Sequence, residues 1–222
     1  EQSLLDVSRA QAMCDALPHA EFVEQAAILE LLRALGADAM PAILHLNASY
    51  YLGPILRRSV FTVLETAGER GGDLLADYLR ANKTRLHRLT PLIEILGTLD
   101  RGRQRDLLIA YSRHPVPAVR KSALTGIYRS LGSEGEKIFM DALKDEDPSV
   151  CQTAITLLAA SRCMSSGFID WLHQVIMCPN PKDVREEGVV VAALRAIGVH
   201  AEGAAQRILA HGLEPQRHSD LL

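Results

Sequence analysis

The stretch "PAVRKSALTGIYRSLG", residues 117–132, decides the fold class of this chain. Its apolar side chains recur at offsets 0, 4, 5, 8 and 12 and are Val119, Ala123, Leu124, Ile127 and Leu131. That spacing places them along one stripe of an α-helix. The closing glycine, Gly132, can adopt a positive φ, which ends a helix without Cβ strain. The stretch therefore predicts an amphipathic helix that stops at Gly132.

The same stripe recurs along the chain. One copy, Val23, Ala27, Ile28, Leu31 and Leu35, ends at Gly36, and another, Val150, Ala154, Ile155 and Leu158, ends near Cys163. Further copies end at Gly68, Gly97 and Gly198. Consecutive ends are 29 to 35 residues apart, and such a period is typical of repeat architectures.

Each stop is followed by a second, shorter helical pattern, such as "SEGEKIFMDALKD". In that segment Ser133 and Glu136 have the spacing of a capping box. Prolines precede the next stripe, as at Pro54, Pro117 and Pro148, and proline suits the first turn of a helix. Each unit is therefore predicted to be a helical hairpin.

A single hairpin of this length cannot be stable alone. Ordering about 31 residues costs on the order of 45 kcal/mol at about 1.5 kcal/mol per residue. Offsetting this requires roughly 1,800 Å² of buried apolar surface at ~25 cal/mol/Å², more than two helices can bury between them. The units must pack on their neighbours, which predicts an all-α, right-handed α-solenoid of about six hairpins.

The predicted organisation has three parts. A capping or continuing helix occupies residues 1–20, the repeats occupy 21–213, and a tail occupies 214–222. The six repeats are expected near residues 21–53, 54–83, 84–114, 115–147, 148–181 and 182–213.

Composition narrows the class of protein. Hydrophobic residues make up 48% of the 222 residues, and the net charge of −3 does not favour a general nucleic-acid binder. No apolar run approaches the ~20 residues that span a bilayer, and no signal peptide is visible. We therefore expect a cytoplasmic protein without membrane insertion. The start at Glu1 rather than Met suggests a module of a larger protein.

Four cysteines are present, at positions 14, 151, 163 and 178, without a CxxC pair. They are interpreted as reduced, buried thiols. The eight histidines are scattered and form no zincin-type helix motif, and no glycine-rich phosphate loop is present. We expect no metal, no cofactor and no catalytic residue.

The repeats resemble a known family. "HPVPAVRKSALTGIYRSLG" and "DEDPSVCQTAITLLA" are similar to HEAT repeats, in particular the PBS-lyase HEAT-like type with its pattern Asp-x-x-Pro-x-Val-Arg-x-x-Ala-x-x-x-Leu-Gly. Val184, Arg185 and Gly198 match a third copy. The resemblance implies an armadillo-like helical scaffold that binds other proteins. It also implies that Arg120 and Asp147 serve structure first, in a ladder between repeats.

Some relatives in this class are enzymes. Deoxyhypusine hydroxylase binds iron through His-Glu pairs, and this chain has no His-Glu dipeptide. HEAT-like DNA glycosylases use an acidic residue amid aromatics, of which Asp170 beside Trp171 is a faint echo. A bilin-lyase-like enzyme subunit stays open as an alternative. The expected protein is not an enzyme.

Charge is unevenly distributed. Residues 1–79 carry 11 acidic and 5 basic side chains, a net charge of −6, whereas residues 80–121 carry 3 and 10, a net charge of +7. The basic centre is either a solvated edge or a docking patch for an acidic protein partner. The candidate partner-binding residues are Arg101, Arg103, Arg105, Arg113, Lys121 and Trp171.

Trp171 is the sole tryptophan and has two interpretations: a partly buried residue between repeats, or an anchor for a partner. The favoured function is non-catalytic protein–protein interaction. Nucleic-acid binding through residues 80–121 is the alternative, although the basic residues there lack interleaved aromatics apart from Tyr111.

Overall fold

The computed structural model describes residues 2–50, 52–100, 102–162, 165–177 and 184–199. Within these ranges the regular structure is entirely helical, and the all-α prediction is confirmed. The α-helices are α1 (Gln2–Ala16), α2 (Phe22–Leu35), α3 (Met40–Ser49), α4 (Pro54–Leu64), α5 (Gly68–Ala81), α6 (Thr90–Asp100), α7 (Arg105–Tyr111), α8 (Pro117–Leu131), α9 (Glu136–Ala142), α10 (Pro148–Ala160), α11 (Ser166–Met177) and α12 (Val184–Val199). Short 3₁₀ helices are η1 (Leu17–His19), η2 (Gly36–Ala39), η3 (Lys83–Arg88) and η4 (Gly132–Gly135).

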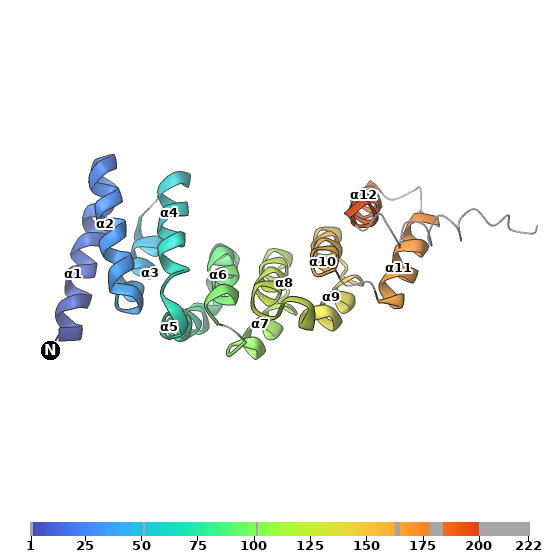
Figure 1. Cartoon of the computed structure of the whole chain (residues 1–222), viewed down its shortest axis with the longest axis horizontal. Helices are drawn as coiled ribbons and strands as arrows, with labels where there is room; N and C mark the ends of the chain where they lie inside the picture. Colours follow the sequence, from blue (N-terminus) through green and yellow to red (C-terminus); the bar gives the residue numbers. More distant parts are fainter. Residues whose placement is uncertain (1, 51, 101, 163–164, 178–183, 200–222) are drawn as a thin grey trace, which may run out of the picture.

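The helices follow one another along the long axis of the molecule (Figure 1). From α2 to α11 they fall in successive pairs within the five ranges 21–53, 54–83, 84–114, 115–147 and 148–181. The second half of the expected sixth range and the tail 214–222 lie outside the described residues. No helix in the described part of the chain is long and apolar enough to cross a bilayer.

The direction of the helices changes in the middle of the row. In Figure 1, α1, α2 and α4 stand upright, whereas α6, α8 and α10 are seen nearly end-on. Helix α8 packs between α6 and α10, and α10 packs against α12. On its other side α6 packs against α5. The change of direction opens a groove between α4 and α6.

Helix ends follow local chemistry. Pro54, Pro117 and Pro148 each occupy the first residue of a helix, as expected from the missing N–H. Gly36 and Gly132 end α2 and α8 with φ of 58° and 55°, which confirms these two stops.

Gly97 was expected to be a stop, and this prediction is wrong. It lies inside α6, where a Cβ would overlap the carbonyl oxygen and Cα of Gly126 in α8. Its small size serves a close helix crossing instead of a turn. The two backbones approach each other at this pair of glycines.

The capping box predicted at Ser133 and Glu136 is also absent, because the chain there continues through the 3₁₀ helix η4 and α9 begins after Gly135. A capping box does occur at the start of α2. The Glu24 carboxylate accepts a hydrogen bond from the Glu21 backbone N–H at 3.0 Å, and the Glu21 side chain accepts one in return.

The apolar stripe is buried in α8 and α10. Val119, Ala123 and Ile127 are fully buried, and Ala154 and Ile155 are too. The corresponding prediction for α2 is wrong, because Val23 is 78% exposed and Leu31 is 51% exposed. Leu32 is the buried residue of that helix.

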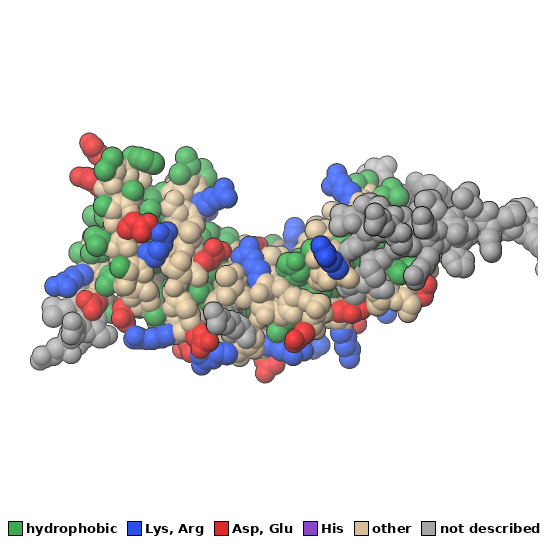
Figure 2. Space-filling view, viewed as in Figure 1, with side chains coloured by type: hydrophobic (Ala, Val, Ile, Leu, Met, Phe, Trp, Pro, Cys, Tyr) green, Lys and Arg blue, Asp and Glu red, His purple; other side chains and the backbone are tan. Residues whose placement is uncertain are grey.

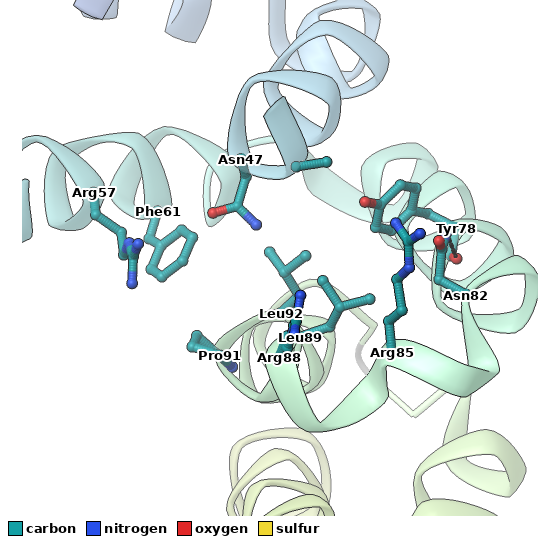
Figure 3. Close-up of a pocket in the computed structure, with 11 residues that line it drawn as sticks. Asn47, Arg57, Phe61, Tyr78, Asn82, Arg85, Arg88, Leu89, Pro91 and Leu92 are labelled. Atoms are coloured by element: carbon teal, nitrogen blue, oxygen red, sulfur yellow. Dashed lines mark hydrogen bonds between the residues drawn. The ribbon is translucent and has the colours of Figure 1, made fainter. Parts of the chain in front are cut away.

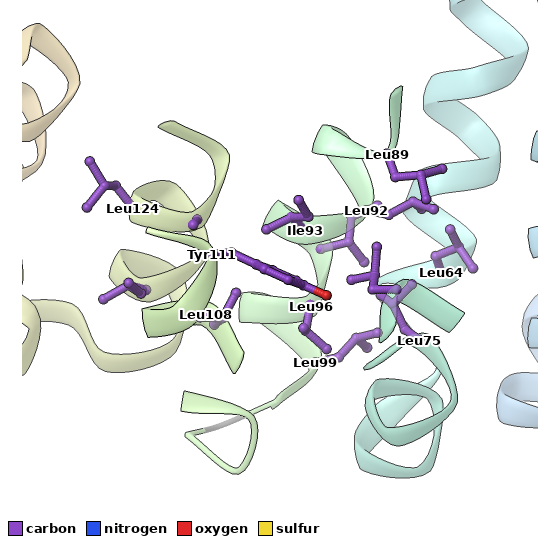
Figure 4. Close-up of a cluster of buried hydrophobic side chains, with 14 of the residues drawn as sticks. Leu64, Leu75, Leu89, Leu92, Ile93, Leu96, Leu99, Leu108, Tyr111 and Leu124 are labelled. Carbon is purple, nitrogen blue, oxygen red and sulfur yellow. The ribbon is translucent and has the colours of Figure 1, made fainter. Parts of the chain in front are cut away.

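One hydrophobic core runs through the row. Figure 4 shows its central part, where leucines of α4, α5 and α6 meet side chains of α7 and α8. Tyr111 lies in this cluster, and burial raises the pKa of its hydroxyl. In the central helices α8 and α10 the core continues across neighbouring pairs, because their apolar stripes are buried against the helices beside them.

Arg120 serves structure, as the resemblance implied, but with a different carboxylate. It is 6% exposed and donates to Asp145 from Nε at 2.8 Å and from an Nη at 2.6 Å. Its other Nη donates to the carbonyls of His114 and Pro115. The hydrogen bonds that Arg120 donates to Asp145, together with the negative charge of Asp145, raise the pKa of Arg120.

Asp147, the expected partner in the ladder, caps α10 instead. Its carboxylate accepts hydrogen bonds from the Ser149 backbone N–H at 2.9 Å and from the Ser149 hydroxyl at 2.6 Å. These bonds lower the pKa of Asp147.

Further polar contacts join successive pairs. Arg103 lies 3.3 Å from Glu69 and 3.2 Å from Asp73, both on α5. Asp73 also accepts a hydrogen bond from the Gln104 amide at 3.0 Å. Acidic side chains of residues 1–79 thus neutralise part of the basic centre.

Candidate functional site

The groove between α4 and α6 holds the strongest candidate site. It contains a cavity of about 320 Å³, within the range of ligand pockets. Its walls come from the ends of α3 and α5, from α4, and from η3 with the start of α6 (Figure 3). Three arginines line it: Arg57, Arg85 and Arg88.

Local structure explains why the arginines face the groove. Arg57 and Phe61 are four residues apart on α4 and so share one side of that helix. The adjacent side of α4 buries Val60 and Val63 in the core. The helix therefore presents its cation and its aromatic ring together.

Arg85 and Arg88 lie on η3, three residues apart. A 3₁₀ helix has three residues per turn, so side chains at this spacing lie above one another. Leu86 and Leu89 point to a different side of η3 and are buried, and Leu89 reaches the base of the cavity. Figure 3 shows Arg88 near Pro91 and Arg85 opposite Tyr78 and Asn82, so the cations are spread along the groove.

The cations of the groove form no ion pair with any residue that the structure describes. No carboxylate lines the cavity, and no ion pair involves Arg57, Arg85 or Arg88 in the described part of the chain. All three are exposed to solvent. Clustered charges of one sign in a cleft focus the electrostatic field and attract anions.

Neutral side chains complete the lining. The Asn82 amide donates to the Tyr78 carbonyl at 2.9 Å, which fixes its orientation. Asn47 adds a second amide, and Leu89 and Leu92 form an apolar floor (Figure 3). The groove is rich in N–H donors above an apolar base, a combination suited to holding carboxylate or phosphate groups beside apolar side chains.

Two of the three arginines predicted to form a patch before α7 lie in the described part of the chain. Arg101 lies outside the described residues, and Arg103 is engaged with Glu69 and Asp73. Arg105 is exposed at the start of α7.

The other predicted site residues lie apart from the groove. Arg113 is exposed after α7, and Lys121 is half-buried on α8. Trp171 on α11 is half-buried and packs against the core. None of these residues lines the groove.

Sequence reasoning found two of the three groove arginines only as members of the basic centre, and it missed Arg57. Averaging over residues 1–79, which are net acidic, concealed the pair Arg57–Arg58. The signal that could have found it was the placement of Arg57 and Phe61 off the apolar stripe of a helix that begins at Pro54.

Thiol and metal chemistry find no support in the described residues. Burial, with a smaller effect of Asp15, raises the pKa of Cys14 to about 12, and burial with Asp145 raises that of Cys151 to about 11. Such thiols stay protonated and unreactive at neutral pH. Among the residues described, no group of three or more His, Cys, Asp or Glu side chains could hold a metal ion.

Comparison with known protein families, with curated proteins and with solved structures gives no match for this chain. The chemistry of the groove is therefore the basis for a functional hypothesis.

Proposed function

We propose that the chain is a non-catalytic HEAT-type α-solenoid whose groove between α4 and α6 binds an acidic segment of a protein partner. The solenoid is supported by helix pairs that follow one another at the period of the sequence repeat. It is also supported by a core that runs across neighbouring pairs.

The observation that carries the binding role is the set of three arginines that line one cavity and form no ion pair with the described residues. Some arginines elsewhere are neutralised internally, as Arg103 is by Glu69 and Asp73 and Arg120 is by Asp145. The three groove arginines form no ion pair with a described residue and gather around one cavity, so their charge is available to a ligand. Guanidinium groups match carboxylates bidentately, which favours a peptide with several Asp or Glu residues.

The layout of the groove favours an extended ligand over a single small anion. Arg57 stands with Phe61 on one wall, and Arg85 stands with Tyr78 on another (Figure 3). A segment with spaced carboxylates can contact several cations in turn, whereas one small anion would engage only part of the set.

The test is binding of a fluorescent glutamate-rich peptide at low salt, measured by anisotropy. Arg57→Glu/Arg88→Glu should weaken binding roughly tenfold or more, equivalent to about 1.4 kcal/mol. The control Arg105→Glu/Arg113→Glu changes the net charge equally outside the groove and should have a much smaller effect.

A single-stranded oligonucleotide of equal charge serves as the competing probe. If it binds more tightly than the peptide, with a steep loss of affinity on adding salt, nucleic-acid binding replaces the proposed function. Equal losses of peptide binding in the groove and control variants would also overturn the proposal.

A further inference from the structure

A second groove lies on the other flank of α4. It separates α4 from α2 and contains a cavity of about 530 Å³. Among the described residues, no charged side chain lines this cavity, whose walls include Phe22, Ala26 and Leu29 of α2 and Ile55 of α4. Phe22 is 80% exposed and Ile55 is 78% exposed.

The exposure of Ile55 distinguishes α4 from the central helices α8 and α10, as the exposure of Val23 distinguishes α2. Ile55 occupies the stripe position that Val119 holds in α8 and Val150 holds in α10, and both valines are buried. Ile55 and Phe22 therefore contribute little to the core of this chain. Hydrophobic side chains gather at the tips of α2 and α4 (Figure 2), and exposed apolar clusters mark interaction sites.

The two grooves are close enough for one ligand. Ile55 and Arg57 are two residues apart on α4, so their side chains diverge by about 200° around the helix. A helix with its side chains is about 10–12 Å wide. An extended segment crosses that width in about three to four residues, and a helical segment crosses it in about seven.

We propose that both grooves bind one segment of the partner, which carries a large apolar side chain about three to seven residues from a group of carboxylates. The apolar side chain enters between Phe22 and Ile55, and the carboxylates reach Arg57 and Arg88. The arginines of the α4–α6 groove require a negatively charged part of the ligand. The uncharged α2–α4 groove favours an apolar side chain in the other part. This inference rests on the proposed function and adds the anchor to it.

The experiment selects binders from a displayed library of random 16-residue peptides with the purified chain. The enriched sequences are expected to combine Asp or Glu with Leu, Ile, Phe or Trp at the stated separation. The selection is repeated with Phe22→Ser/Ile55→Ser and with the control Val23→Ser/Leu31→Ser, which removes two exposed apolar side chains outside the groove.

The groove variant should lose the apolar preference and keep the acidic one, and the control should keep both. Because the changed side chains are exposed, both variants should unfold at nearly the same urea concentration as the parent chain. A selected peptide should bind the groove variant roughly tenfold more weakly, and this loss should persist at high salt, where charge contacts are screened.

Three outcomes would overturn the inference. Acidic peptides without an apolar preference would remove the anchor and leave the proposed function standing. An apolar preference that survives in Phe22→Ser/Ile55→Ser would place the anchor elsewhere. Enrichment of no acidic sequence would overturn the proposed function itself, and the inference with it.

Discussion

Helices α8 and α2 carry the same apolar spacing and bury it to different extents. In α8, Val119 and Ile127 are fully buried between α6 and α10. In α2, Val23 and Leu31 remain exposed, although α1 and α4 pack on other parts of that helix. The two stripes have the same spacing and similar apolar residues. The helices that pack beside each stripe therefore decide whether it becomes part of the core.

The polar contacts of the two regions differ in the same way. The central pair Arg120–Asp145 has side chains that are 8% and 13% exposed. Near the N-terminal helices, Arg70 lies 3.0 Å from Asp38, but its side chain is 68% exposed. The loss of one polar contact should therefore lower the free energy of unfolding more in the central region than in the N-terminal region.

The largest difference in stability between the two regions should come from breaking an ion pair in each. Asp145→Ala leaves the Arg120 guanidinium buried without its carboxylate, and it should lower the free energy of unfolding by about 3–5 kcal/mol. Asp38→Ala breaks an exposed pair and should cost about 1 kcal/mol or less. Urea denaturation followed by circular dichroism measures both. Similar losses in the two variants would contradict the contrast between the regions.

The second difference concerns the apolar stripe. Ile127→Ala removes buried methyl groups and leaves a cavity, so it should cost roughly 3 kcal/mol. Leu31→Ala removes a side chain that is half exposed and should cost well under half of that. Thermal unfolding of the two variants at equal protein concentration checks the ratio. A large loss in Leu31→Ala would mean that α2 is covered in solution.

The smallest difference concerns two glycines. Gly97→Ala places a methyl group against the backbone of Gly126 and should cost about 2 kcal/mol as α6 and α8 move apart. Gly53, before α4, has open space around its Cβ position, and Gly53→Ala should be close to neutral. Guanidinium midpoints compare the pair, and equal midpoints would argue against the close crossing.

Sequence periodicity predicted the helices well because proline and glycine act locally. The starts of α4, α8 and α10 follow from the fixed φ of proline, and the ends of α2 and α8 follow from the positive φ of Gly36 and Gly132. Gly97 was misread because a glycine that ends a helix and a glycine that admits a neighbouring helix look the same in one sequence.

The candidate site was harder to predict, because it depends on which helices fail to pack closely. Arg57, Arg85 and Arg88 meet only where the helix direction changes between α4 and α6. The role of Asp147 at the start of α10 was also not predictable from the sequence alone. A carboxylate near a helix start can cap it or pair with an arginine, and only the position of Arg120 decides between them.

The contacts of Arg103 with Glu69 and Asp73 also bear on how the chain assembles. A segment of negative charge docks on a following segment of positive charge, and Arg120 then joins that segment to Asp145. If helical pairs exchanged places, within one chain or between two chains, some of these charged side chains would lie beside a side chain of the same charge or would lose their partner. The opposite charges of residues 1–79 and 80–121 therefore favour the observed packing of these units over swapped arrangements.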